Sequence, residues 1–262
     1  MKLSAQQSAR LFPSRAYLPR LLADPRQPVA SAKFVFVTQS ADSFGSGVDG
    51  EAAIGTAIPV FIISGSSVRH SLVFGVEGGV FGKFRLEKAE RDLISTDWVF
   101  SAPFVLHRGD SWYRFGYHHT SAHLGDEFAE RFNVSRVNFG RDIISGLAHL
   151  QVSRGLAVYG GGGWAFNVDP NETKRFSAQT GLELERVRAS AGVVPYGAVD
   201  VLLDQDRGWD PRVNIQVGLR MYQIGPGRDL RMAAEVLNGP SPEGEFFDRR
   251  TTFITFGVYV TP

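Results

Sequence analysis

The sequence predicts an all-β protein: a closed antiparallel up-and-down transmembrane β-barrel of about 12 strands with an irregular N-terminal arm. Apolar and polar residues alternate with a period of two through most of the chain after residue 30. No segment has a sustained 3.6-residue period. The connections between these segments are short and long in turn, which is typical of outer-membrane barrels and not of Greek-key sandwiches.

Composition narrows the class of protein. The net charge of +1 gives no sign of a nucleic-acid partner. The absence of cysteine excludes a disulfide scaffold, Cys-ligated zinc and a cysteine nucleophile. No window approaches 18 consecutive apolar residues, so a transmembrane helix is not expected. Residues 1–16 lack the apolar segment of a signal peptide, so for an exported protein we expect the mature chain, or one behind an added Met1.

The chain divides into two parts. Residues 1–30 contain several prolines without alternation, and we expect a periplasmic arm with a helical turn around Leu18 to Ala23. Residues 31–262 are expected to form the outer-membrane barrel. The predicted strands lie at about 32–40, 51–63, 68–87, 93–106, 111–123, 133–151, 155–167, 174–188, 192–204, 211–224, 228–238 and 250–261.

The alternating faces predict an inverted distribution of polarity. In 212–222 one face carries Val213, Ile215, Val217, Leu219 and Met221, and the other carries Arg212, Asn214, Gln216, Gly218 and Arg220. A barrel of about 12 strands needs polar filling or water inside, so the apolar face should meet lipid. A soluble barrel or sandwich is the alternative and would bury the apolar face. We expect a hydrogen-bonded lumen set of Arg114, Arg136, Asn138, Asp142, Glu183, Arg212 and Arg220.

The stretch SWYRFGYHHTSAHLGD, residues 111–126, carries the candidate chemistry. His119 and Ser121 lie on one face of the predicted strand, about 7 Å apart along it. An imidazole at this spacing can act as the base for a serine nucleophile, and the base needs an orienting acceptor. We expect Asn133 in that role, at the start of the next strand. The alternative is that His118, His119 and His123 belong to an interfacial girdle.

Asp126 and Glu127 follow this strand and form a candidate Ca²⁺ site, because paired loop carboxylates and backbone oxygens are typical Ca²⁺ ligands. Such an ion could hold the oxyanion of a lipid-ester hydrolase. The alternative is a solvated acidic turn with Glu130 and Arg131.

The segment from His119 to Asn133 resembles the outer-membrane phospholipase A family, a twelve-stranded barrel with His-x-Ser on one strand and an Asn twelve residues after the Ser. This resemblance implies Ser121 as nucleophile, His119 as base and Asn133 as orienting residue. The lipid A deacylases have a similar His-x-Ser, with Glu in the third role. The residues after Ser121, Ala122-His123-Leu124-Gly125, depart from the Asn-Gly continuation of the phospholipase.

A longer likeness covers most of residues 15–262. The segments 21–26, 82–86, 91–94, 117–127 (YHHTSAHLGDE) and 136–139 resemble the bacterial family called domain of unknown function 1207, whose members resemble outer-membrane barrels. This resemblance implies a location but no activity.

Three functions follow as expectations. The first is an outer-membrane barrel of uncharacterised activity with a polar, largely filled lumen and outer-membrane lipids as its partners. The second is a lipid-ester hydrolase with Ser121, His119 and Asn133 on the outer wall. The third is a small-solute channel.

Overall fold

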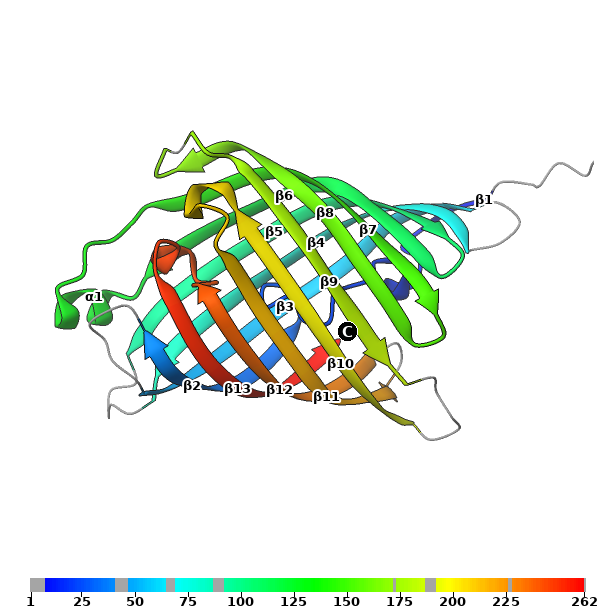
Figure 1. The fold of residues 1–262 in the computed structure, drawn as a ribbon. Coiled ribbons are helices and arrows are strands. Elements are labelled where there is room, and N and C mark those ends of the chain that lie inside the picture. Colours follow the sequence, from blue (N-terminus) through cyan, green and yellow to red (C-terminus); the bar gives the residue numbers. More distant parts are fainter. Residues whose placement is uncertain are drawn as a thin grey trace, which may run out of the picture.

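The computed structural model describes residues 8–40, 47–64, 69–86, 92–171, 173–186, 192–225 and 228–261. These residues contain thirteen strands, of which twelve form a closed antiparallel barrel (Figure 1). Neighbours along the chain pair with each other, and pairing of β13 with β2 closes the sheet. The predicted fold class is confirmed. The barrel strands are β2 (Ala30–Ser40), β3 (Gly47–Ser64), β4 (His70–Arg85), β5 (Leu93–Arg108), β6 (Ser111–Leu124), β7 (Phe139–Ser153), β8 (Leu156–Asp169), β9 (Phe176–Glu185), β10 (Val193–Asp204), β11 (Pro211–Gly225), β12 (Arg228–Pro240) and β13 (Arg250–Thr261).

Five short elements complete the described structure: β1 (Ser8–Leu11), the 3₁₀ turns η1 (Arg15–Tyr17), η2 (Gln205–Arg207) and η3 (Gly244–Phe246), and the helix α1 (Asp126–Phe132). Within the described ranges, no helix has the length and apolar character needed to cross a membrane.

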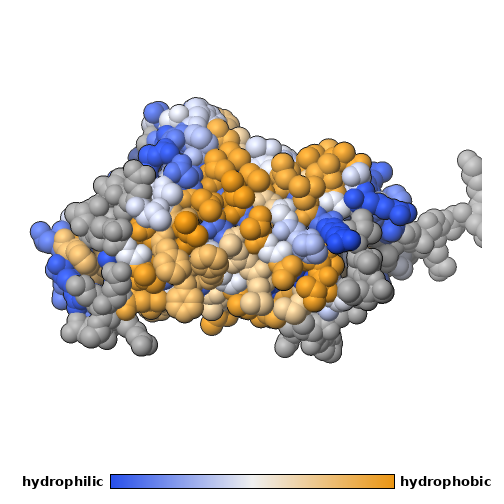
Figure 2. Space-filling model, turned by 60° about the horizontal axis from the view of Figure 1, so that its bottom comes forward, coloured by the Kyte–Doolittle hydropathy of each residue, from blue (hydrophilic) through white to orange (hydrophobic). Residues whose placement is uncertain are grey.

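The two faces of β11 have the polarity that the sequence predicts. On β11, Ile215 and Leu219 are 45% and 48% exposed, whereas Asn214 and Gln216 are 1% exposed. Figure 2 shows the result on one side of the molecule, where hydrophobic residues form a band between two hydrophilic ends. An outer wall of this kind suits a bilayer, and it excludes the soluble barrel of the alternative prediction.

The two ends of the barrel differ in their connections. Strands β3, β5, β7, β9 and β11 finish at one end of the barrel, which we call the turn end. The other end, the loop end, carries the connections that contain α1, η2 and η3. Strand β6 runs from the turn end to the loop end, so its last residues lie at the loop end.

The N-terminal arm enters the barrel. Strand β1 pairs with residues 61–64 of β3, past the part of β3 that pairs with β2. The chain after β1, drawn in dark blue, then runs through the lumen (Figure 1). The amide of Leu22 donates to Glu183 Oε1 at 2.7 Å, and Asn214 Nδ2 donates to the carbonyl of Ala23 at 2.7 Å. The expected helical turn at 18–23 was wrong: the turn is η1, which ends at Tyr17, directly before that segment. Pro19 explains this shift, because it disfavours helical backbone at the residue before it.

The loop between β12 and β13, residues 241–249, folds into the lumen at the loop end and meets the arm there. Arg26 of the arm lies 2.9 Å from Asp97 Oδ2 and 3.8 Å from Glu243 Oε1 of the loop. Lys83 Nζ lies 3.0 Å from the same Glu243 oxygen. Buried charges need partners of opposite sign. These ion pairs therefore fix the arm and the loop to each other and to the wall.

Candidate functional site

Strand β6 presents one row of side chains outside the barrel and the other inside. Tyr113 and Phe115 are exposed on the outer wall, whereas Trp112 is buried and Arg114 pairs with Glu77. The parity that the sequence predicts for this strand is therefore confirmed. His119 and Ser121 continue the outward row toward the loop end.

His119 has a carboxylate partner on the neighbouring strand. Its backbone position pairs with that of Asp142 on β7, and His119 Nδ1 lies 2.7 Å from Asp142 Oδ1. The side chain of His119 is 37% exposed and that of Asp142 is 16% exposed. Contact through Nδ1 leaves Nε2 on the far side of the ring, as the base of a serine hydrolase requires.

Two further donors hold Asp142 in place. The hydroxyl of Tyr117 donates to Oδ1 at 2.5 Å, and Asn167 Nδ2 donates to Oδ2 at 2.7 Å. A carboxylate with both oxygens hydrogen-bonded is fixed in orientation. Asp142 can therefore set the ring position of His119.

Ser121 lies beside open space on the outer wall. Its cross-strand neighbours are Trp98 on β5 and Gly140 on β7. A Cβ atom built on Gly140 would meet nothing closer than the Cβ atom of Asp169, at 4.0 Å. In the described residues no hydrogen bond joins Ser121 to His119, and such bonds are often long until substrate binds.

Asn133 does not lie where the sequence placed it. Residues 126–132 form α1, and Asn133 is its C-terminal cap in a left-handed conformation (φ 50°). Its backbone N–H bonds to carbonyls of α1, and β7 begins only at Phe139. The expected strand start at residue 133 was wrong because Asp126, Glu127 and a phenylalanine pair four residues apart form a helix. The structure brings Asp142 to His119, and Asn133 remains in the loop.

The faces of β7 are also the reverse of those expected. Arg141 and Ile143 line the lumen, and Asp142 lies on the outer wall, although the sequence predicted it inside. Arg136 pairs with Asp126 in the loop, and Asn138 contacts Asp169. Both were predicted in the lumen and are instead exposed. Of the predicted lumen set, contacts with the arm or the wall confirm Arg114, Glu183 and Arg220, and burial confirms Arg212.

The two acidic residues proposed for Ca²⁺ form the first turn of α1 and are exposed. Asp126 is paired with Arg136. Across the described residues, no group of three or more His, Asp or Glu side chains is arranged to hold a metal ion. Among the described residues no third side chain of this kind joins Asp126 and Glu127, and the Ca²⁺ site there stays a prediction.

Aromatic residues surround the His119 and Asp142 pair on the outer wall. Tyr117 lies between Phe100 and Phe166, with ring centroids 6.3 and 6.2 Å away. Phe166 in turn contacts Trp164. Aromatic residues of this kind gather at membrane–water interfaces. Sequence reasoning missed Asp142, because only the register of β6 against β7 reveals that it faces His119.

Comparisons with known proteins agree with this architecture. A family model described as "Protein of unknown function (DUF1207)" matches residues 4–261. No curated protein sequence matches the chain.

Three solved structures are similar in fold. Outer membrane phospholipase A from Escherichia coli has 10% identity and a TM-score of 0.59, over 91% of this chain and 93% of its own. The Salmonella typhi outer membrane phospholipase dimer with bound calcium has 11% identity and a TM-score of 0.55, over 91% and 94%. KdgM porin in complex with disordered oligogalacturonate has 11% identity and a TM-score of 0.50, over 88% and 98%. At these identities the likeness shows the outer-membrane barrel fold alone.

Proposed function

The chain belongs to the DUF1207 family, and we propose that it is an outer-membrane serine hydrolase that acts on lipid esters. The observation that carries this proposal is the 2.7 Å contact between His119 Nδ1 and Asp142 Oδ1. It supplies the oriented base that a serine nucleophile needs, and Ser121 lies two residues further along the same outward face.

The surroundings of these residues support a lipid as substrate. Trp98 and Phe100 are exposed on β5 beside Ser121 and His119. The three polar side chains thus lie on the apolar outer wall near the loop end, among residues suited to an interface. A phospholipid or lipid A molecule in the same leaflet would present its ester carbonyl at this depth.

The reaction follows from the arrangement of the three residues. Ser121 Oγ attacks the ester carbonyl carbon while His119 Nε2 takes the hydroxyl proton, and Asp142 stabilises the imidazolium that forms. His119 returns the proton to the leaving alkoxide, which departs as the alcohol, and Ser121 keeps the acyl group. Water then attacks the acyl-enzyme with His119 again as base. The products are a fatty acid and the deacylated lipid.

Fatty-acid release by the purified barrel in mixed micelles of detergent and phospholipid, or detergent and lipid A, tests the proposal. Ser121→Ala should abolish release, and Asp142→Ala should lower it strongly, because His119 loses its orienting carboxylate. Asp142→Asn should retain more activity than Asp142→Ala, because an amide oxygen can still accept from the imidazole. Labelling of Ser121 by a fluorophosphonate, read by intact mass, gives a measurement independent of turnover.

Ser153→Ala is the matched control, because Ser153 is exposed at the far end of β7. Parallel assays with Ca²⁺ and with a chelator test the Ca²⁺ prediction at Asp126 and Glu127. If the wild-type protein shows no ester release and no labelling under either condition, hydrolysis is contradicted, and the barrel lacks this activity. The arm and the loop inside the lumen support a closed barrel over a small-solute channel.

A further inference from the structure

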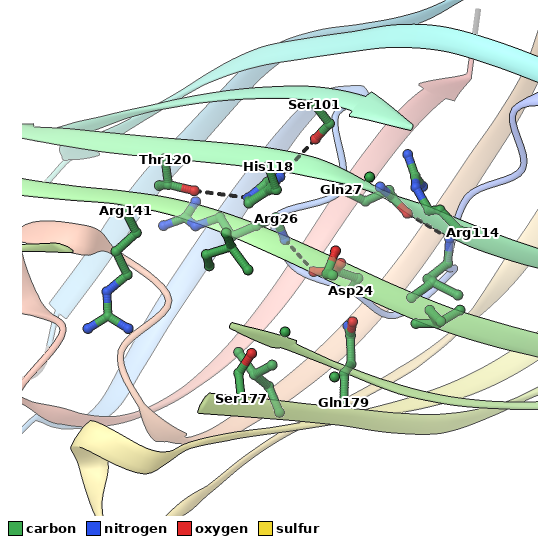
Figure 3. Close-up of a pocket in the computed structure, with 18 of the residues that line it drawn as sticks. Asp24, Arg26, Gln27, Ser101, Arg114, His118, Thr120, Arg141, Ser177 and Gln179 are labelled. Carbon is green, nitrogen blue, oxygen red and sulfur yellow. Dashed lines mark hydrogen bonds between the residues drawn. The ribbon is translucent and has the colours of Figure 1, made fainter. Parts of the chain in front are cut away.

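A cavity of about 250 Å³ lies in the lumen between the arm, the inserted loop and the barrel wall. Figure 3 shows its polar lining, with side chains from the arm, from β5 to β7 and from β9 around one space. It is separate from the outer-wall residues, since His118 and Thr120 line it while His119 and Ser121 face outward. Its volume is slightly below the range of about 300–1,000 Å³ that is typical of ligand pockets.

Arginine dominates the charges of this cavity. Five arginines line it, against the three acids Asp24, Glu77 and Asp204. Four of these arginines have an ionic partner inside the described protein: Arg26 with Asp97, Arg114 with Glu77, Arg141 with Asp206 and Arg207 with Asp204. Of the charged lining residues, Arg212 and Asp24 are therefore left without an ion pair in the described part of the protein.

The remaining guanidinium belongs to Arg212. This residue is only 7% exposed, and its Nε is fully buried without a hydrogen-bond partner. No hydrogen bond or ion pair connects its side chain to any other described residue. A buried charge without a partner is strongly unfavourable. Asp200 acts on Arg212 electrostatically but forms neither a hydrogen bond nor an ion pair with it, so the guanidinium can still bind an anion in the cavity.

Two of the lining arginines, Arg212 and Arg141, act electrostatically on a third, Arg207. Burial lowers the pKa of Arg207 to about 10; Asp204 opposes this effect, whereas Arg212 and Arg141 add to it. The guanidinium of Arg207 is therefore close enough to those of Arg212 and Arg141 to be repelled by both. An anion placed among them would relieve that repulsion and would pair with Arg212.

We infer that the lumen cavity binds a small anionic solute, a molecule of about monosaccharide size that carries a carboxylate or a phosphate group. Arg212 binds the charged group, since a guanidinium matches both groups with two parallel hydrogen bonds. Ser177 and Gln179 point into the same space and can bond hydroxyl groups of the solute (Figure 3).

Isothermal titration calorimetry on the full-length barrel in detergent tests this inference with three probes that share a sugar ring. D-glucose 6-phosphate and D-glucuronate distinguish a phosphate from a carboxylate, and D-glucose is the neutral control. Wild type should bind at least one anion and not glucose. Arg212→Gln should weaken that binding about 10–100-fold, as expected for the loss of a charged bidentate pair. Arg212→Lys should give an intermediate affinity.

Arg220→Gln is the matched control, because Arg220 lies on the same strand and wall but is paired with Glu185 and Asp229 and does not line the cavity. It should bind the anion as the wild type does. Without ligand, Arg212→Gln should melt at the same or a higher temperature than wild type, whereas Arg220→Gln should melt lower. Equal anion affinities for wild type and a folded Arg212→Gln would overturn the inference. So would binding of neither anion by wild type.

Discussion

The adjacent residues His118 and His119 lie on opposite walls of one strand and have different partners. In the lumen, His118 Nδ1 contacts Ser101 Oγ at 2.8 Å and Nε2 contacts Thr120 Oγ1 at 3.0 Å. On the outer wall, His119 contacts a carboxylate through Nδ1, and its Nε2 has no partner among the described residues. Because both of its ring nitrogens have hydrogen-bond partners, His118 is a structural residue. One oriented and one free nitrogen make His119 suited to proton transfer.

Substituting each histidine in turn by alanine tests this difference most directly. His119→Ala should lower the rate of lipid-ester hydrolysis about 10²–10⁴-fold, because it removes the general base. Its folding should change little, since the side chain is partly exposed. Fatty-acid release in mixed micelles measures the rate, and the heat-dependent gel mobility of the barrel measures folding.

His118→Ala is the counterpart on the inner wall. It leaves the hydroxyls of Ser101 and Thr120 without their partner, so it should destabilise the barrel by about 1–3 kcal/mol. Hydrolysis per folded molecule should be far less affected than in His119→Ala. An equal loss of hydrolysis in the two variants would show that the two walls do not differ in the way proposed.

The second prediction concerns the lumen alone. Arg26→Ala should destabilise the barrel by about 3–5 kcal/mol, because it leaves the buried carboxylate of Asp97 without its ionic partner. Unfolding by urea in detergent measures this loss. Arg69→Ala is the control, since Arg69 and Asp110 form an exposed pair at the turn end and should contribute about 0–1 kcal/mol. A similar loss of unfolding free energy in the two variants would mean that these ion pairs do not hold the arm in place.

The smallest effect is a pH dependence. Burial by itself would raise the pKa of Glu243, but Lys83 and Arg26 outweigh it and lower the pKa to about 2. A depressed carboxyl pKa stabilises the fold above the unfolded value of about 4.5, and this contribution disappears as the pH falls toward 2. The difference in unfolding free energy between wild type and Glu243→Gln should therefore shrink between pH 5 and pH 2. A constant difference would contradict this pairing.

Much of the barrel could be predicted from the sequence, because alternation reports directly which side chains share a face. Strands β4, β6, β9 and β11 show their two faces without ambiguity, and residues 250–261 were predicted with their observed bounds. The prediction failed at 133–138, where the short helix α1 moved the start of β7. That shift decided which of Asn133 and Asp142 could meet His119.

The sequence by itself determined that this chain forms a β-barrel with an apolar outside and a polar inside, because a period of two is a local property of the strand. It also determined that His119 and Ser121 share the outward face. Only the tertiary structure decided the partners of these residues: Asp142 through the register of β6 and β7, and the arm and the loop through their contacts in the lumen. Strand register and the path of a loop depend on contacts between residues far apart in the chain, which alternation along one strand does not encode.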